Sequence, residues 1–255
     1  MSPVFEVKKD IPDKSFLRWA ACGTAPLGVL AFWGGMLMAA RQYPSGYEWQ
    51  YMPVSNLLSP DRNPAGYLWA SAGILLCSLC GLCWVAVLAK QLWNHEGAGD
   101  RPSGIRALQF GYFCMMCAAL LPRWLLRIQK GHEILAVLAF AGLLIGMVRL
   151  MFQTMGWILL RRMRRFSSHA RLYAAILASV AVFPILLAGL AQAYFYYVPS
   201  ELHWLSFSWR ARGWPVLLRF AFWEWVTCVV LSAYIAILSL ATYAVYLTSK
   251  AGEGT

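Results

Sequence analysis

Charged residues are scarce in this sequence, and their scarcity restricts the class of protein that it can encode. Asp, Glu, Lys and Arg make up 13% of the 255 residues, whereas 60% of the residues are hydrophobic. A soluble domain carries about 25% charged residues, which keep its surface hydrated. This chain has too few charges to cover a water-exposed surface, so an ordinary soluble globular protein is excluded.

The sequence also lacks internal repeats, low-complexity tracts and the alternating segments of about ten residues that are typical of transmembrane β-barrels. It contains instead six long apolar runs, each close to the roughly 20 residues that a helix needs to cross a bilayer. They occupy residues 16–40, 67–93, 105–122, 132–160, 170–192 and 217–248. The sequence therefore predicts an all-α, polytopic integral membrane protein, a bundle of six transmembrane helices that forms one domain over residues 1–255.

The first apolar run has the position of a signal peptide but not its length. Its apolar stretch from Ala20 to Ala40 is longer than the 7–15 residues of a signal-peptide core. We therefore predict that this run is retained as the first transmembrane helix.

Lys and Arg are unevenly distributed between the two ends of the predicted helices. Thirteen lie on the side that holds both termini, and eight lie on the other. The thirteen are Lys8, Lys9, Lys14, Arg18, Lys90, Arg101, Arg106, Arg161, Arg162, Arg164, Arg165, Arg171 and Lys250; the eight are Arg41, Arg62, Arg123, Arg127, Lys130, Arg210, Arg212 and Arg219. Because loops rich in Lys and Arg stay in the cytoplasm, both termini are predicted to be cytoplasmic.

The net charge of +11 does not indicate nucleic-acid binding. The basic residues cluster at the ends of the predicted helices, where they meet anionic lipid headgroups. Membrane lipids are therefore the predicted partners, with partner membrane subunits as a further expectation, and neither a nucleic acid nor a cofactor is predicted.

Cysteines form two motifs, "CSLCGLC" at 77–83 and "CMMC" at 114–117. Cys spacing of this kind also occurs in zinc and iron–sulfur sites. However, these residues fall in the middle of apolar helices, where Cys behaves as a small apolar side chain. We predict packing rather than metal binding, with a metal or redox role and palmitoylation as the alternatives.

Ionisable residues near the outer ends of the predicted helices are the main candidates for a functional site. His132 opens the fourth helix, and Glu224 lies about two turns into the last helix, within "FWEWVT". A buried carboxylate needs a proton, a cation or a hydrogen-bond donor, because burying it without a partner is costly. Arg123, Arg127 and the hydroxyl groups of the loop before the second helix lie on the same side. We predict that these groups form one polar pocket facing the outer leaflet.

Three short motifs resemble a known six-helix membrane family. They are "PVSNLLSPDRNPAGYLWASAG" at 53–73, "GHEILAVLAF" at 131–140 and "WEW" at 223–225. The family includes the DRAM autophagy modulators, the FGF-receptor-activating protein involved in GPI-anchor lipid remodelling, and bacterial relatives. The resemblance places Ser55, His132, Glu224 and Trp225 at family positions, and Asn56 stands where many members have Asp. It implies a role in binding or remodelling a lipid or a lipid-linked molecule.

Two classes of function are compatible with this pocket. If the protein is an enzyme, we expect a lipid hydrolase or acyltransferase with Ser55, His132 and Glu224 as catalytic residues and with Asn56, Arg123, Arg127 and Trp225 as substrate-binding residues. His132 would be a general base, or a metal ligand together with Glu224, and Ser55 a nucleophile or oxyanion donor. The alternative is a non-catalytic accessory or scaffold subunit in which the same cluster joins helices. A transporter is disfavoured because the sequence has no inverted repeat.

The aromatic segment at 193–216 is predicted to cover the pocket.

Overall fold

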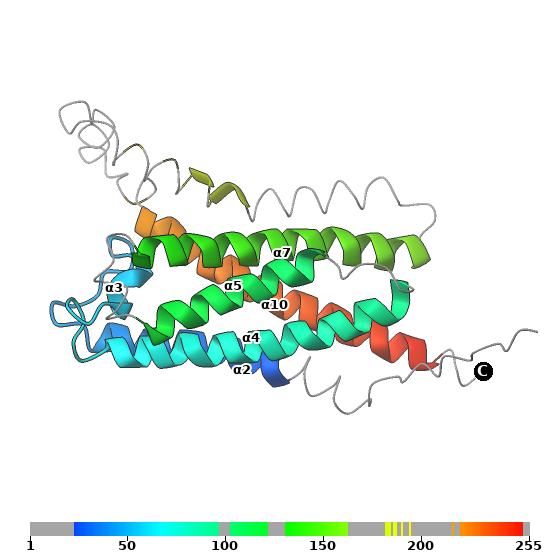
Figure 1. Cartoon of the computed structure of the whole chain (residues 1–255), viewed down its shortest axis with the longest axis horizontal. Coiled ribbons are helices and arrows are strands. Elements are labelled where there is room, and N and C mark those ends of the chain that lie inside the picture. The colour runs from blue at the N-terminus through cyan, green and yellow to red at the C-terminus, as the bar shows by residue number, and fades with distance from the viewer. Residues whose placement is uncertain are drawn as a thin grey trace, which may run out of the picture.

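The protein is all-helical in the part of the chain that the structure, a computed structural model, describes. That part comprises residues 23–96, 103–121, 131–162 and 220–251, with a few single positions between 182 and 216. Six helices occupy it (Figure 1): α2 (Ala25–Arg41), α3 (Val54–Leu58), α4 (Tyr67–Glu96), α5 (Ser103–Leu120), α7 (Gly131–Arg162) and α10 (Phe220–Ala251).

Five of these helices coincide with apolar runs in the sequence. Helices α4, α5, α7 and α10 begin within a few residues of the predicted positions, and α2 begins at Ala25, with Pro26 in its first turn. Proline suits this place because the N–H group that it lacks has no partner within the helix. The short helix α3 was not predicted, since the whole segment between α2 and α4 reads as a loop. The run at 170–192 lies mostly outside the described residues.

Two of the helices are long and apolar enough to cross a membrane by length and composition alone. These segments are Tyr67–Ala89 in α4, with mean hydropathy 2.3, and Ala221–Leu240 in α10, with mean hydropathy 1.8. Shorter apolar segments are Ala25–Arg41, Gly104–Leu120 and Ile134–Leu150. The arrangement with six spans stays a prediction.

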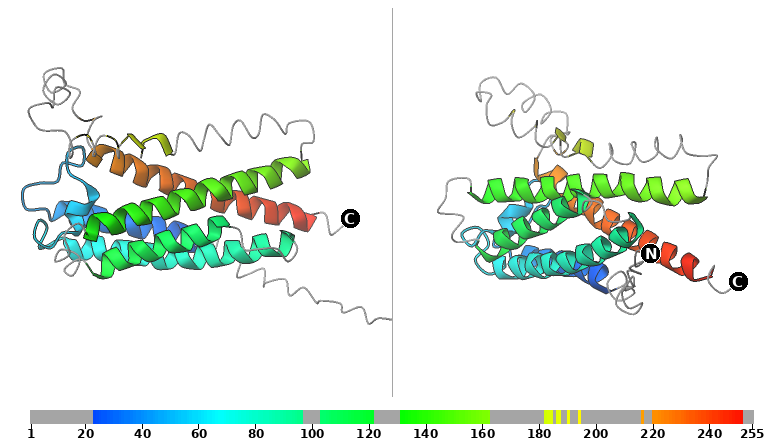
Figure 2. Two further views of the ribbon diagram at one scale, coloured as in Figure 1. Left: turned by 45° about the horizontal axis from the view of Figure 1, so that its top comes forward. Right: turned by 45° about the vertical axis from the view of Figure 1, so that its right-hand side comes forward.

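The five long helices form a closed ring. Each of α2, α4, α5 and α7 packs against the next, and α10 contacts both α7 and α2 and so completes the ring. Figures 1 and 2 show α3 at one end of the bundle, where α2 and α5 end and where α4, α7 and α10 begin. This end, called the α3 end below, therefore gathers segments that are far apart in the sequence.

Glycines allow two pairs of helices in the ring to approach closely. Gly35 of α2 faces Gly73 of α4, and a Cβ atom added to Gly73 would lie 2.7 Å from the Ala31 carbonyl oxygen and 2.9 Å from the Gly35 Cα. Gly111 of α5 and Gly142 of α7 meet in the same way. Small residues at helix–helix contacts are typical of membrane bundles, in which packing replaces the hydrophobic effect.

Candidate functional site

The backbone of α3 is attached to α10 by a buried carboxylate. Val54 is the first residue of α3, and Pro53 before it provides no side chain that could cap the helix. The N–H group of Val54 donates instead to Oε2 of Glu224, at 2.9 Å. Glu224 is buried, with 7% of its surface exposed. Within the described residues, this is the hydrogen bond that the Glu224 side chain accepts.

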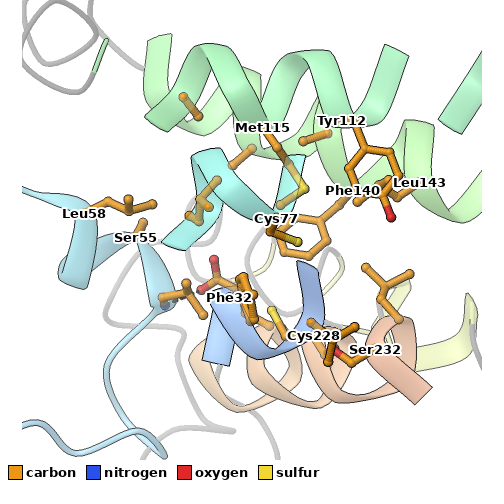
Figure 3. A pocket seen from close by; sticks show the side chains of 18 of the residues that line it. Phe32, Ser55, Leu58, Cys77, Tyr112, Met115, Phe140, Leu143, Cys228 and Ser232 are labelled. Carbon is orange, nitrogen blue, oxygen red and sulfur yellow. Dashed lines mark hydrogen bonds between the residues drawn. The ribbon is translucent and has the colours of Figure 1, made fainter. Parts of the chain in front are cut away.

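Beside this hydrogen bond lies a cavity of about 100 Å³ in the centre of the bundle. All six described helices contribute to its wall. Figure 3 shows Ser55 and Leu58 of α3 on one side of the cavity, and Tyr112 and Leu143 on the other. The lining comprises Val29, Phe32, Val54, Ser55, Leu58, Ile74, Cys77, Tyr112, Met115, Ala118, Ala136, Ala139, Phe140, Leu143, Glu224, Cys228, Leu231, Ser232 and Ile235.

The wall of the cavity is mostly apolar, and it carries one acidic side chain and no basic one among the described residues. The Ser232 hydroxyl group is already engaged, because it donates to the Cys228 carbonyl oxygen at 2.8 Å and accepts from the indole N–H of Trp33 at 3.0 Å. Ser55 and Glu224 thus form a polar group at the α3 end of an otherwise apolar space.

Trp225, the residue after Glu224, binds the loop rather than the cavity. Its indole N–H donates to the Tyr47 hydroxyl oxygen at 3.0 Å and to the Met52 carbonyl oxygen at 3.3 Å. The Tyr47 hydroxyl group in turn donates to the carbonyl oxygens of Met52, at 2.8 Å, and Pro53, at 3.0 Å. Burial raises the pKa of Tyr47 well above its usual value, so the phenol stays protonated and remains a donor.

Two asparagines between α2 and α4 make hydrogen bonds that hold their own loop together. The side-chain oxygen of Asn56 accepts a hydrogen bond from the Arg62 guanidinium group. Asn63 is fully buried, and its amide nitrogen donates to the carbonyl oxygens of Ala39, at 3.0 Å, and Leu57, at 3.4 Å. Its side-chain oxygen accepts from the N–H of Gly66 at 3.2 Å. Asn63 therefore connects the end of α2, the end of α3 and the turn before α4.

The structure brings two of the predicted site residues together and places two others elsewhere, while the side chains of three lie outside the part of the chain that it describes. Ser55 and Glu224 line one cavity, whereas Asn56 and Trp225 form the loop contacts described above. His132 is the second residue of α7, at the α3 end, but its side chain is not described. Arg123, Arg127 and most of the aromatic segment at 193–216, the predicted cover, lie outside the described residues.

Three residues of the site and its loop, Tyr47, Asn63 and Cys228, were not predicted from the sequence. Tyr47 has no signal in the sequence, since a Tyr beside a membrane helix is typical of the interface. Asn63 precedes Pro64, and the Asn–Pro pair marks a turn, which was a usable signal. Cys228 lines the cavity together with Cys77, and both are buried free thiols. The described residues contain no group of His, Cys, Asp and Glu side chains that could hold a metal ion.

Comparison of this chain with protein-family models, with curated proteins and with solved structures finds no match.

Proposed function

We propose that this chain is a multi-pass membrane protein in which the six apolar runs at 16–40, 67–93, 105–122, 132–160, 170–192 and 217–248 span the bilayer as helices, with both termini in the cytoplasm. Large apolar side chains point outward from every long helix described, which suits a surface in contact with lipid tails. They include Leu30 and Leu37, Leu76 and Leu79, Phe110 and Phe113, Ile134 and Val137, and Ile237 and Leu240. The glycine contacts between helices and the uneven distribution of Lys and Arg support the same proposal.

The topology is tested by introducing single cysteines at two positions, one on each predicted side of the membrane, in intact cells. Asp61→Cys lies in the loop at the α3 end, and Met163→Cys lies in the basic segment after α7. A membrane-impermeant maleimide added from outside should label the first variant and not the second. Labelling of both, or of Met163→Cys alone, would contradict the proposed orientation.

We also propose that the cavity binds the alkyl chain of a lipid or of a lipid-linked molecule. The observation that carries it is an apolar space at the centre of the bundle, lined by every described helix. An engineered apolar cavity of about 150 Å³ stays dry and binds benzene, so a cavity of about 100 Å³ can hold part of an alkyl chain. In a membrane, lipid tails are the apolar molecules present at high concentration, which makes them the natural occupants.

Photolabelling with a diazirine-bearing alkyl alcohol in phosphatidylcholine nanodiscs tests this binding. The probe should label lining residues such as Leu58 and Met115, and unlabelled dodecanol should compete with that labelling. Ala136→Phe, which fills part of the cavity, should reduce the labelling. Val137→Phe is the matched control, because Val137 is 62% exposed on the outer surface. Labelling that Ala136→Phe leaves unchanged would refute the proposal.

A non-catalytic accessory or scaffold role is the second candidate function. It is favoured by the fact that Glu224 and Trp225 both make hydrogen bonds to the loop between α2 and α4. On this view the two residues hold that loop against α10 and do no chemistry. A Glu224→Gln variant that unfolds more easily but still shows the cavity labelling of the unmodified protein would support this structural role.

As the reaction of an enzymatic form of this function, we propose lipid hydrolysis or acyl transfer. The position of Ser55 in the cavity supports it, since a hydroxyl group there would meet a bound lipid. Membership of the DRAM and FGF-receptor-activating protein family is likewise proposed, on the motifs around Ser55, His132 and Glu224. The conservative variant Ser55→Ala, assayed for release of fatty acid from membrane lipids, tests the reaction directly.

A further inference from the structure

We propose that the α3 end of the cavity binds the amino group of a cationic single-chain amphiphile, with Glu224 as its counter-ion. This inference rests on the proposed function, the binding of an alkyl chain, and adds the chemical class of the headgroup. It starts from the juxtaposition of one buried carboxylate with an apolar cavity.

The charge of the cavity wall selects between headgroups. Among the described residues that line the cavity, Glu224 is the acidic one, and none is Lys, Arg or His. A phosphate or carboxylate headgroup would therefore meet a group of its own charge, without a compensating cation from the described wall. An ammonium group instead supplies a cation, one of the partners that stabilise a buried carboxylate, in addition to the Val54 N–H that Glu224 already has.

The hydrogen bonds around Glu224 leave room for such a ligand. Oε2 accepts from the Val54 N–H at 2.9 Å, which fixes the carboxylate beside α3. A carboxylate can accept several hydrogen bonds, and an ammonium group carries three donors. The Ser55 hydroxyl group on the same wall provides a further acceptor. Ser232 is less suited, because its hydroxyl group is already bonded to Cys228 and Trp33.

The shape of the lining sets the orientation of the ligand. On α10 it extends from Glu224 to Ile235, which corresponds to about 16 Å at the rise of an α-helix. Glu224 and Ser55 lie at the α3 end, and apolar residues such as Leu231 and Leu143 line the remainder. An amphiphile would thus place its headgroup near the end of the bundle and its chain toward the middle. Lipids have this orientation in a bilayer.

Competition among three ligands with the same chain tests the proposal. Dodecylamine, dodecanol and dodecanoate would each compete with the photoreactive alkyl alcohol in phosphatidylcholine nanodiscs, and labelling of Leu58 and Met115 would be measured. In the unmodified protein we expect dodecylamine to compete at about tenfold lower concentration than dodecanol, with dodecanoate the weakest. Labelling of the outward-facing Leu30 should be unaffected, which separates the cavity from bulk lipid.

The variant Glu224→Gln should abolish the preference for the amine, because it removes the charge and keeps an acceptor for the Val54 N–H. Glu48→Gln is the matched control, since Glu48 is an exposed carboxylate in the loop between α2 and α4, and it should preserve the preference. Equal competition by dodecylamine and dodecanol in the unmodified protein would overturn the inference and leave alkyl binding standing. A preference that survives Glu224→Gln would also overturn it. Absence of cavity labelling by the probe would refute the proposed function itself.

If Glu224→Gln fails to fold, the order of the three ligands in the unmodified protein still decides. Competition by dodecanoate that equals or exceeds that of dodecylamine would contradict a negatively charged site.

Discussion

The N–H group of Val54 and the carboxylate of Glu224 are joined by a 2.9 Å hydrogen bond between residues 170 positions apart in the sequence. The bond satisfies an N–H that the first turn of a helix leaves unpaired. It also brings a carboxylate to the edge of an apolar cavity. One residue could therefore stabilise the fold, bind a ligand, or do both.

Substitution of Glu224 separates these roles. Glu224→Leu removes the acceptor and leaves the buried Val54 N–H without a partner, which should lower the free energy of unfolding by about 1–3 kcal/mol. Glu224→Gln keeps an acceptor and should lose less. Thermal unfolding in detergent micelles, with Glu48→Gln as the control, measures both effects. Equal stability of Glu224→Leu and the unmodified protein would show that the bond contributes nothing to the fold.

The close contact between α2 and α4 predicts a contrast between a glycine at the contact, Gly73, and a glycine of α2 that lies away from it, Gly34. Gly73→Ala would place a Cβ atom 2.7 Å from the Ala31 carbonyl oxygen, so the helices must separate, at a cost of about 1–3 kcal/mol. Gly34→Ala is the control, because no atom lies within 4 Å of the added Cβ. It should be neutral or slightly stabilising, as Ala favours helices. Unfolding midpoints that fall equally in the two variants would contradict the close contact.

Because Tyr47 is largely buried, we expect the protein to become less stable at alkaline pH. Burial raises its pKa in the folded protein, whereas an unfolded Tyr ionises near pH 10. Above about pH 10 the unfolded chain loses a proton that the folded protein keeps, so stability falls as pH rises. Tyr47→Phe loses the hydrogen bonds to Met52 and Pro53, and it should be less stable than the unmodified protein at pH 7.

That difference in stability should narrow above about pH 10, because Phe does not titrate. Chemical unfolding at pH 7 and at increasing alkaline pH measures it. Tyr43→Phe serves as the control for the loss of a phenol from the same loop. A difference between Tyr47→Phe and the unmodified protein that is constant with pH would contradict the burial of the Tyr47 hydroxyl group.

The long helices were predictable because each rests on a long apolar run, a signal that does not depend on tertiary contacts. Gly66 and Tyr67 illustrate this, since α4 begins directly after the turn that the sequence places there. Helix α3 was not predictable in the same way. It has five residues and no side-chain cap of its own, and the acceptor for its first N–H comes from α10.

The candidate site was predictable in part for a related reason. Glu224 stands out in the sequence because an acidic residue is rare within an apolar run, and Ser55 was placed with it by topology and resemblance. Asn56 and Ser55 are adjacent in the sequence, yet Asn56 binds Arg62 while Ser55 lines the cavity. In a helix, consecutive side chains point in different directions. Without knowledge of α3, the sequence could not separate the two.

Asn63 provides a test of whether the loop between α2 and α4 is held by a single buried amide. Asn63→Asp replaces the two donors to the Ala39 and Leu57 carbonyl oxygens with an oxygen atom that repels them. It retains the acceptor for the Gly66 N–H. Because the residue is fully buried, neither the new charge nor the carbonyl groups can recover hydration. We expect the free energy of unfolding to fall by at least about 2 kcal/mol.

Gln50→Glu makes the same amide-to-acid change at an exposed position of this loop and should have little effect. If thermal unfolding in detergent gives the same midpoint for both variants, Asn63 does not hold the loop. Glu224 and Trp225 would then be the residues that fix α3 against the bundle.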